Sequence, residues 1–132
     1  MTGGVMLIGP ARPVLRMFDL EIAKTFYIDW LAFSLDWEYR PESGGPSIME
    51  VSRGHTTIHL SEHYGDGSPG AKLLVEVDDV SSLHRELQSR PNGYMKPAVE
   101  ATEWDTKILV ILDPFGNRLV FSQTISPDSE TC

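Results

Sequence analysis

The chain has 132 residues, of which 41% are hydrophobic and 23% are charged, a composition typical of one globular domain with its own core. Its formal net charge of −8 repels nucleic-acid phosphates and therefore excludes a nucleic-acid partner. No apolar run approaches the ~20 residues of a membrane span, no signal peptide is recognisable, and Cys132 is the only cysteine, so we expect a cytoplasmic protein that does not bind membranes.

The first half of the chain predicts one strand, one helix and three further strands. Residues 1–12 form a Gly-rich arm, and residues 13–17 are the first strand candidate. Asp19 is placed to cap a helix whose apolar residues recur every three or four positions up to Leu31. Three strand candidates separated by turn residues follow, at 34–40, 47–52 and 55–61.

The second half repeats this order of elements. Residues 64–70 are rich in glycine and mark a boundary between halves at about 13–63 and 71–123. A strand at 72–77 precedes a helix that Asp78 or Asp79 caps and that runs through Leu87. Strands are predicted at 96–101, 108–112 and 118–122, followed by a polar tail at 124–132.

The last two strands are joined by the sequence DPFGN at 113–117. Pro114 fixes φ for a first turn position, Asp113 can accept hydrogen bonds from the backbone beyond it, and Gly116 tolerates positive φ. This turn resembles the closing hairpin of the glyoxalase/bleomycin-resistance (vicinal oxygen chelate) superfamily. Three other segments carry the same resemblance, namely PVLRMFDLEIAKTFYIDWLAF, TTIHLSEH and VEVDDVSSLHREL.

The resemblance extends over residues 13–123 and implies an α+β fold. Two βαβββ modules are expected to form a curved eight-stranded mixed sheet around a cleft. In metal-dependent members, four strands each supply a His or Glu ligand. The matching positions here are Arg12, His59, Lys72 and Val120, of which only His59 is able to bind a metal. We therefore expect no metal and no cofactor.

Three histidines share one parity around the fourth strand of the first half. His55, His59 and His63 are each four residues apart, a spacing of about 13 Å along a strand, too long for two of them to chelate one ion. A metal site here needs ligands from another strand. His59 is otherwise either a hydrogen-bonding group in the cleft or a satisfied polar residue of the sheet. No nucleophilic set is recognised, so no catalytic residue is assigned.

Strand positions that do not pack under the helices are expected to face the cleft, and their mixture of apolar and polar side chains favours a ligand pocket. The candidate ligand-binding residues are Arg16, His59, Lys72 and Arg118 at such positions, and Trp37, Met49, Tyr64 and Trp104 at the rim of the cleft. Trp104 lies in a polar context, where a large ring is costly unless it is covered. It either stacks on a ligand, as the resemblance implies, or fills a dimer interface or core edge.

The resemblance is closest to the metal-free bleomycin-resistance branch, whose members are acidic, dimeric and bind a cationic drug. It predicts a homodimer that confers antibiotic resistance by sequestering bleomycin-like or other planar cationic compounds. One alternative is a metal-dependent lyase, isomerase or dioxygenase built around His59 with Glu76 or Glu62. The other is a regulatory or interaction module with an empty cleft.

Overall fold

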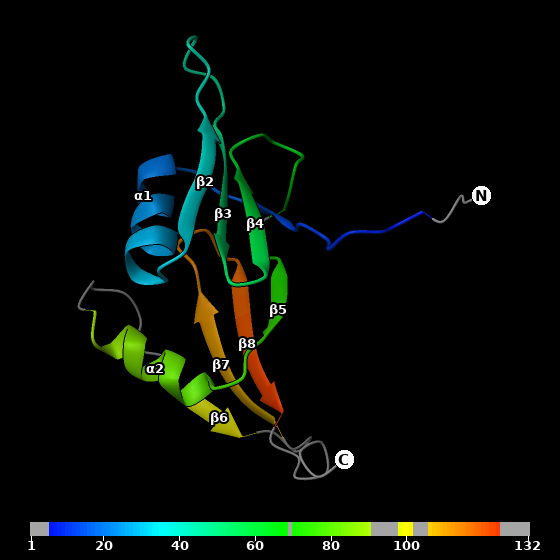
Figure 1. Cartoon of the computed structure of the whole chain (residues 1–132). Coiled ribbons are helices and arrows are strands. Elements are labelled where there is room, and N and C mark those ends of the chain that lie inside the picture. The colour runs from blue at the N-terminus through cyan, green and yellow to red at the C-terminus, as the bar shows by residue number, and fades with distance from the viewer. Residues whose placement is uncertain (1–5, 69, 91–97, 102–105, 125–132) are drawn as a thin grey trace.

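A computed structural model of the chain describes residues 6–68, 70–90, 98–101 and 106–124. Each half contains one helical segment and four strands (Figure 1). The elements of the first half are β1 (Val14–Arg16), α1 (Leu20–Lys24), η1 (Thr25–Trp30), β2 (Ser34–Tyr39), β3 (Ile48–Arg53) and β4 (Thr56–Ser61). Those of the second half are β5 (Lys72–Glu76), α2 (Val80–Gln88), β6 (Val99–Ala101), β7 (Thr106–Leu112) and β8 (Arg118–Thr124). The α+β class and the repeated βαβββ order are confirmed.

The strands form two separate four-stranded sheets rather than one sheet of eight. The first has the order β1-β4-β3-β2 and the second has the matching order β5-β8-β7-β6. In each sheet the outer pair β1/β4 or β5/β8 is parallel, and the remaining pairs are antiparallel. Among the described residues no ladder joins the sheets, so the expectation of one continuous sheet is wrong. The halves are held together by side chains instead.

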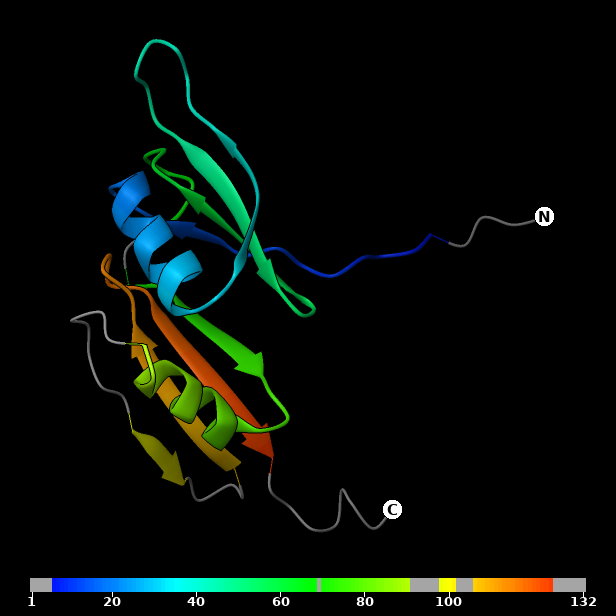
Figure 2. The same cartoon turned by 60° about the vertical axis from the view of Figure 1, so that its left-hand side comes forward.

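Both helical segments lie on the same side of the molecule, each against its own sheet (Figures 1 and 2). The first begins at Asp19, whose carboxylate accepts a hydrogen bond from the Ile22 N–H at 3.0 Å, as the cap prediction required. It widens into the π-helical η1, in which Phe26, Tyr27 and Trp30 are all buried. In the second half Asp79, not Asp78, caps α2.

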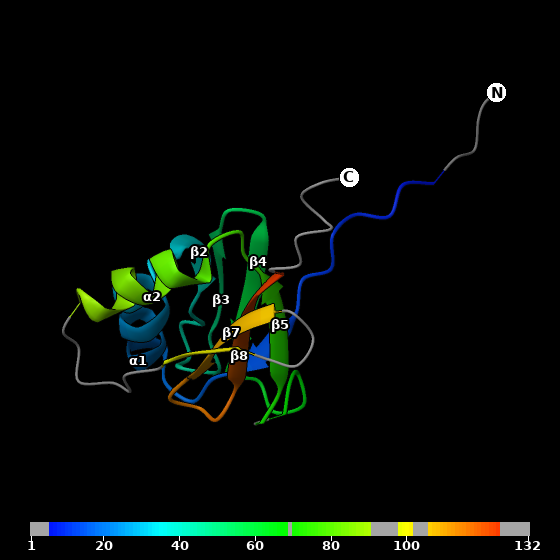
Figure 3. The same ribbon diagram turned by 90° about the horizontal axis from the view of Figure 1, so that it is seen from below.

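The core lies between the helices and the sheets and runs through both halves. Leu15, Val51 and Leu60 contribute from the first sheet, and Leu109 and Leu119 from the second. Each strand therefore presents its other side chains to the face without a helix, which we call the open face of that sheet. Figure 3 shows the helices on one side and the N-terminal arm leaving on the other.

A buried polar cluster at the DPFGN turn joins the two halves. The Tyr27 hydroxyl donates to Asp113 Oδ2 at 2.6 Å, a contact between residues 86 positions apart. Asp113 Oδ1 accepts from the backbone N–H groups of Phe115 and Asn117, both at 2.8 Å. Asn117 Nδ2 donates to Asp113 Oδ2 and to the Arg16 carbonyl, both at 2.9 Å. The predicted turn therefore also forms one of the contacts between the halves.

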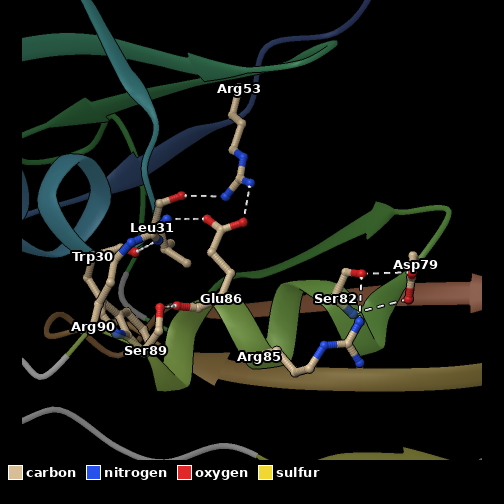
Figure 4. Close-up of polar contacts among 9 residues, drawn as sticks. All are labelled: Trp30, Leu31, Arg53, Asp79, Ser82, Arg85, Glu86, Ser89 and Arg90. Atoms are coloured by element: carbon tan, nitrogen blue, oxygen red, sulfur yellow. Dashed lines mark hydrogen bonds and ion pairs between the residues drawn. The ribbon is translucent and has the colours of Figure 1, made fainter.

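A second polar cluster, drawn in Figure 4, caps the end of η1 with side chains from both halves. Arg53 donates to the Leu31 carbonyl and to Glu86 Oε1, at 2.9 and 2.8 Å. Arg90 donates to the Trp30 carbonyl and to Glu86 Oε2, both at 2.5 Å. These hydrogen bonds satisfy carbonyls that the end of a helix leaves unpaired. Hydrogen bonding from Arg53, and then from Arg90, lowers the pKa of Glu86 against the opposing effect of burial.

Candidate ligand-binding site

The open face of the first sheet carries a row of four residues from four strands. Val14 on β1 pairs with His59 on β4, His59 pairs with Glu50 on β3, and Glu50 pairs with Trp37 on β2. Met49 and Val51, on either side of Glu50, are fully buried under the helix, which places Glu50 on the opposite face. The row therefore crosses the whole sheet.

The three central side chains of this row are in direct contact. His59 Nε2 and Glu50 Oε1 share a hydrogen bond of 2.9 Å. The Trp37 ring meets the His59 ring edge to face, with 5.3 Å between centroids and 83° between planes. Glu50 is only 15% exposed and Trp37 is 44% exposed. The row thus combines an accessible aromatic ring with a carboxylate in a largely covered position, an arrangement that can accept a planar cation.

Arg16 lies in the neighbouring row of the same face, where it pairs with Ser61. Its guanidinium carbon stands 5.1 Å from the Phe18 ring centroid and 5.9 Å from the Tyr64 ring centroid. Tyr64 itself is 96% exposed, in the segment that follows β4. The sequence placed Arg16 and Tyr64 in the same site, and the structure brings these two side chains together.

Lys72 and Arg118 belong to the second sheet, where they pair across β5 and β8. The next row of that face contains Leu74 paired with Val120, and Val120 paired with Val110. Leu74 is 65% exposed. The open face of the second sheet is therefore apolar at its middle and cationic at one end, unlike the row around His59.

The structure does not place two of the predicted site residues, Met49 and Trp104, in the site. Met49 is fully buried in the core beneath the helical segment, so its expected position at the rim of the cleft is wrong. The reason is parity, since adjacent apolar residues Ile48 and Met49 left the inward-facing position of the strand ambiguous. Trp104 lies outside the described residues.

Glu50 was missed by the sequence reasoning, although its position between Met49 and Val51 was the available signal. Of the three histidines of equal parity, only His59 lies within β4, because the strand spans Thr56–Ser61. Within the described part of the chain, no three His, Cys, Asp or Glu side chains are grouped as a metal site would need. Neither helix of that part is long and apolar enough to cross a membrane.

The paired four-stranded sheets and their open faces define a protein of the glyoxalase/bleomycin-resistance fold class. A family model described as glyoxalase superfamily protein matches residues 1–128, so this chain belongs to the glyoxalase superfamily. None of the curated protein sequences matches the chain.

Solved structures of similar fold include several antibiotic-binding proteins. A bleomycin-binding protein complexed with bleomycin is 25% identical, with a TM-score of 0.67 over 88% of this chain and 98% of that one. The bleomycin-binding protein of bleomycin-producing Streptomyces verticillus, complexed with copper(II)-bleomycin, is 27% identical, with a TM-score of 0.67 over 91% and 98%. TnmS3, an antibiotic-binding protein from Streptomyces sp. CB03234, is 26% identical, with a TM-score of 0.67 over 91% and 99%.

Proposed function

We propose that this chain is a metal-free, cytoplasmic, homodimeric protein that binds and sequesters planar cationic compounds of the bleomycin type. The observation that carries this proposal is the row Trp37–Glu50–His59 on the open face of the first sheet. An exposed ring offers a stacking surface for a flat ligand, and Glu50 offers it a negative charge. Similarity to proteins solved with bleomycin bound supports the same ligand class.

The charge of the whole chain also favours a cationic ligand. A formal net charge of −8 attracts cations over several ångströms and disfavours polyanions. On the open face of the first sheet, Glu50 is held by His59 rather than by a Lys or Arg. Its negative charge is thus not neutralised by a permanent cation among its described contacts, and a ligand amine can take that role.

Dimer formation is supported by apolar surface that a monomer leaves in water. Met6, Leu7 and Ile8 are 77%, 90% and 86% exposed in an arm that extends away from the body (Figure 1). On the second sheet, Leu74 and Leu112 are 65% and 51% exposed. Apolar surface of this kind marks an interaction site, and a second copy that covers these faces would enclose the ligand between two subunits.

Titration calorimetry with metal-free and copper-loaded bleomycin tests the proposal on protein first assayed for bound metal. We expect one drug per subunit and at least about fivefold weaker binding in Trp37→Ala, because stacking on an aromatic ring is worth about 1 kcal/mol or more. Leu35→Ala is the matched control: Leu35 lies on the same strand but pairs with the inward-facing Val51. Trp104→Ala tests the second stacking residue that the sequence predicted.

Three results contradict the proposed drug binding, and a fourth contradicts the proposed dimer. If Trp37→Ala binds the drug as strongly as the parent protein, the drug does not bind on the open face of the first sheet. Absence of drug binding together with a stoichiometric divalent metal favours an enzyme built around His59. Absence of both drug and metal favours an interaction module. A monomer by sedimentation at micromolar concentration contradicts the dimer separately from the binding claim.

A further inference from the structure

A cavity of about 770 Å³ lies between the two halves, away from the predicted ligand-binding residues. It is bounded by the turn between β3 and β4, the end of β5 and the first turns of α2. Its lining among the described residues includes neither Trp37, His59 nor Arg16. The volume is within the range of about 300–1,000 Å³ found for sites that hold small molecules.

The floor of this cavity is apolar. Side chains from both halves form it, and all are buried or half-buried: Leu31, Phe33, Val75, Val77, Leu83 and Phe121. Because the floor combines aliphatic and aromatic side chains, it can cover a flat hydrocarbon body and remove it from water. The cavity thus has room and chemistry for an organic molecule rather than for an ion alone.

The mouth of the cavity is acidic. Four carboxylates line it, those of Glu76, Asp78, Asp79 and Glu86, against one guanidinium, that of Arg53, and one imidazole, that of His55. Arg53 is already bonded to Glu86 and to a helix-end carbonyl (Figure 4). Asp79 caps α2 through the backbone N–H and the hydroxyl of Ser82.

Glu76 and Asp78 remain as the unpaired charges at the mouth. Both are exposed, and neither side chain has a hydrogen bond or an ion pair with a described residue. A cation seated above the apolar floor would meet two free carboxylates and no free guanidinium. The charge at the mouth is therefore complementary to a cation and repels an anion.

We propose that this cavity is a second binding site, separate from the Trp37–Glu50–His59 row, for a small organic cation with a flat apolar body. The apolar floor holds the body of the ligand, and Glu76 and Asp78 pair with its ammonium or amidinium group. This site does not depend on the proposed bleomycin-type function, since it uses neither Trp37 nor a second subunit.

The test uses two probes with the same ring and opposite charges, 2-naphthylmethylammonium and 2-naphthylacetate, in titrations of the full chain. We expect the cation to bind one per subunit and at least about tenfold more tightly than the anion. In the double variant Glu76→Gln/Asp78→Asn the affinity for the cation should fall about tenfold, the effect of losing two exposed ion pairs, and the preference over the anion should disappear. Added salt should weaken cation binding to the parent protein.

Two controls make the result specific to this cavity. Glu42→Gln/Glu100→Gln changes the net charge equally at exposed positions outside the lining, and it should leave cation binding unchanged. Trp37→Ala should also leave it unchanged, although it weakens binding at the proposed bleomycin site. The proposal would be overturned if both probes bound equally, or if the two double variants lost cation affinity equally. It would also be overturned if Trp37→Ala lost cation affinity, or if the cation did not bind at millimolar concentration in several-fold excess over the protein.

Discussion

Replacing Tyr27 with Phe should lower the stability of this protein by about 2 kcal/mol. The change deletes only a hydroxyl, because Phe fills the same space and keeps the ring contacts to Phe26 and Phe33 at 5.0 and 6.3 Å. The lost hydrogen bond, 2.6 Å long, runs to the buried Asp113. Hydrogen bonds to a charged group contribute about 1.5–3 kcal/mol. The lower part of this range applies because the Asp113 carboxylate still accepts three other hydrogen bonds.

Thermal unfolding measures this change, and about 2 kcal/mol corresponds to a fall in Tm of about 8 °C for a chain of this length. Tyr39→Phe is the matched control, since Tyr39 is 58% exposed on β2, and its Tm should stay within about 2 °C of the parent. A Tyr27→Phe protein as stable as the parent would refute the reasoning that the Tyr27–Asp113 contact holds the halves together.

The same contact predicts a dependence on alkaline pH. Burial, and then the charge and hydrogen bond of Asp113, raise the pKa of Tyr27 well above its ordinary value of 10.0. The native state therefore keeps this proton in conditions where the unfolded chain loses it. Stability from this source is fully present below pH 10 and falls as the pH rises further. Tyr27→Phe should reduce that fall, which denaturant titrations between about pH 8 and 11 can measure.

Two further predictions concern other contacts. Glu86→Gln should destabilise the native state at neutral pH and reduce the loss of stability below pH 4.5. The Arg53 and Arg90 hydrogen bonds lower the pKa of Glu86, and their contribution to stability is lost as Glu86 is protonated. An unchanged dependence of stability on acidic pH in this variant would contradict the prediction. Gly67→Ala should destabilise the protein by about 1–3 kcal/mol, because the added Cβ would stand 2.9 Å from the Val14 carbonyl oxygen. Gly9→Ala is the control and should be neutral, because no atom lies within 4 Å of its added Cβ. Equal melting temperatures of the two variants would refute this reasoning.

Local patterns in the sequence were enough to predict most of the elements and the fold class. Alternation and turn residues located the strands to within a few residues, and the carboxylates at Asp19 and Asp79 marked both helix starts because a cap acts over only three positions. The separation into two sheets could not be predicted in this way. Strand pairing depends on contacts between distant segments, and the element order of each half is compatible with one sheet or with two.

The candidate site was predicted only in part, for the same physical reason. His59 was assigned to the cleft from strand parity and Trp37 to its rim as an aromatic residue, and the structure places the two rings in contact. Met49 was wrongly assigned to the site, whereas its neighbour Glu50, which does lie on the open face, was overlooked. A shift of one residue in strand parity produces this error, because successive side chains point to opposite faces.

The DPFGN turn connects the sequence signature to the geometry of the site. Glycine and proline explain why the chain turns there, but they do not explain Asp113 and Asn117, which are both buried. Asp113 holds the loop through two backbone N–H groups and holds the first half through Tyr27. Asn117 donates to the carbonyl of Arg16, so the closing hairpin also fixes the strand that carries Arg16 on the open face. The residues that identify this turn in the sequence therefore align the two halves, and through β1 they position part of the candidate ligand-binding face.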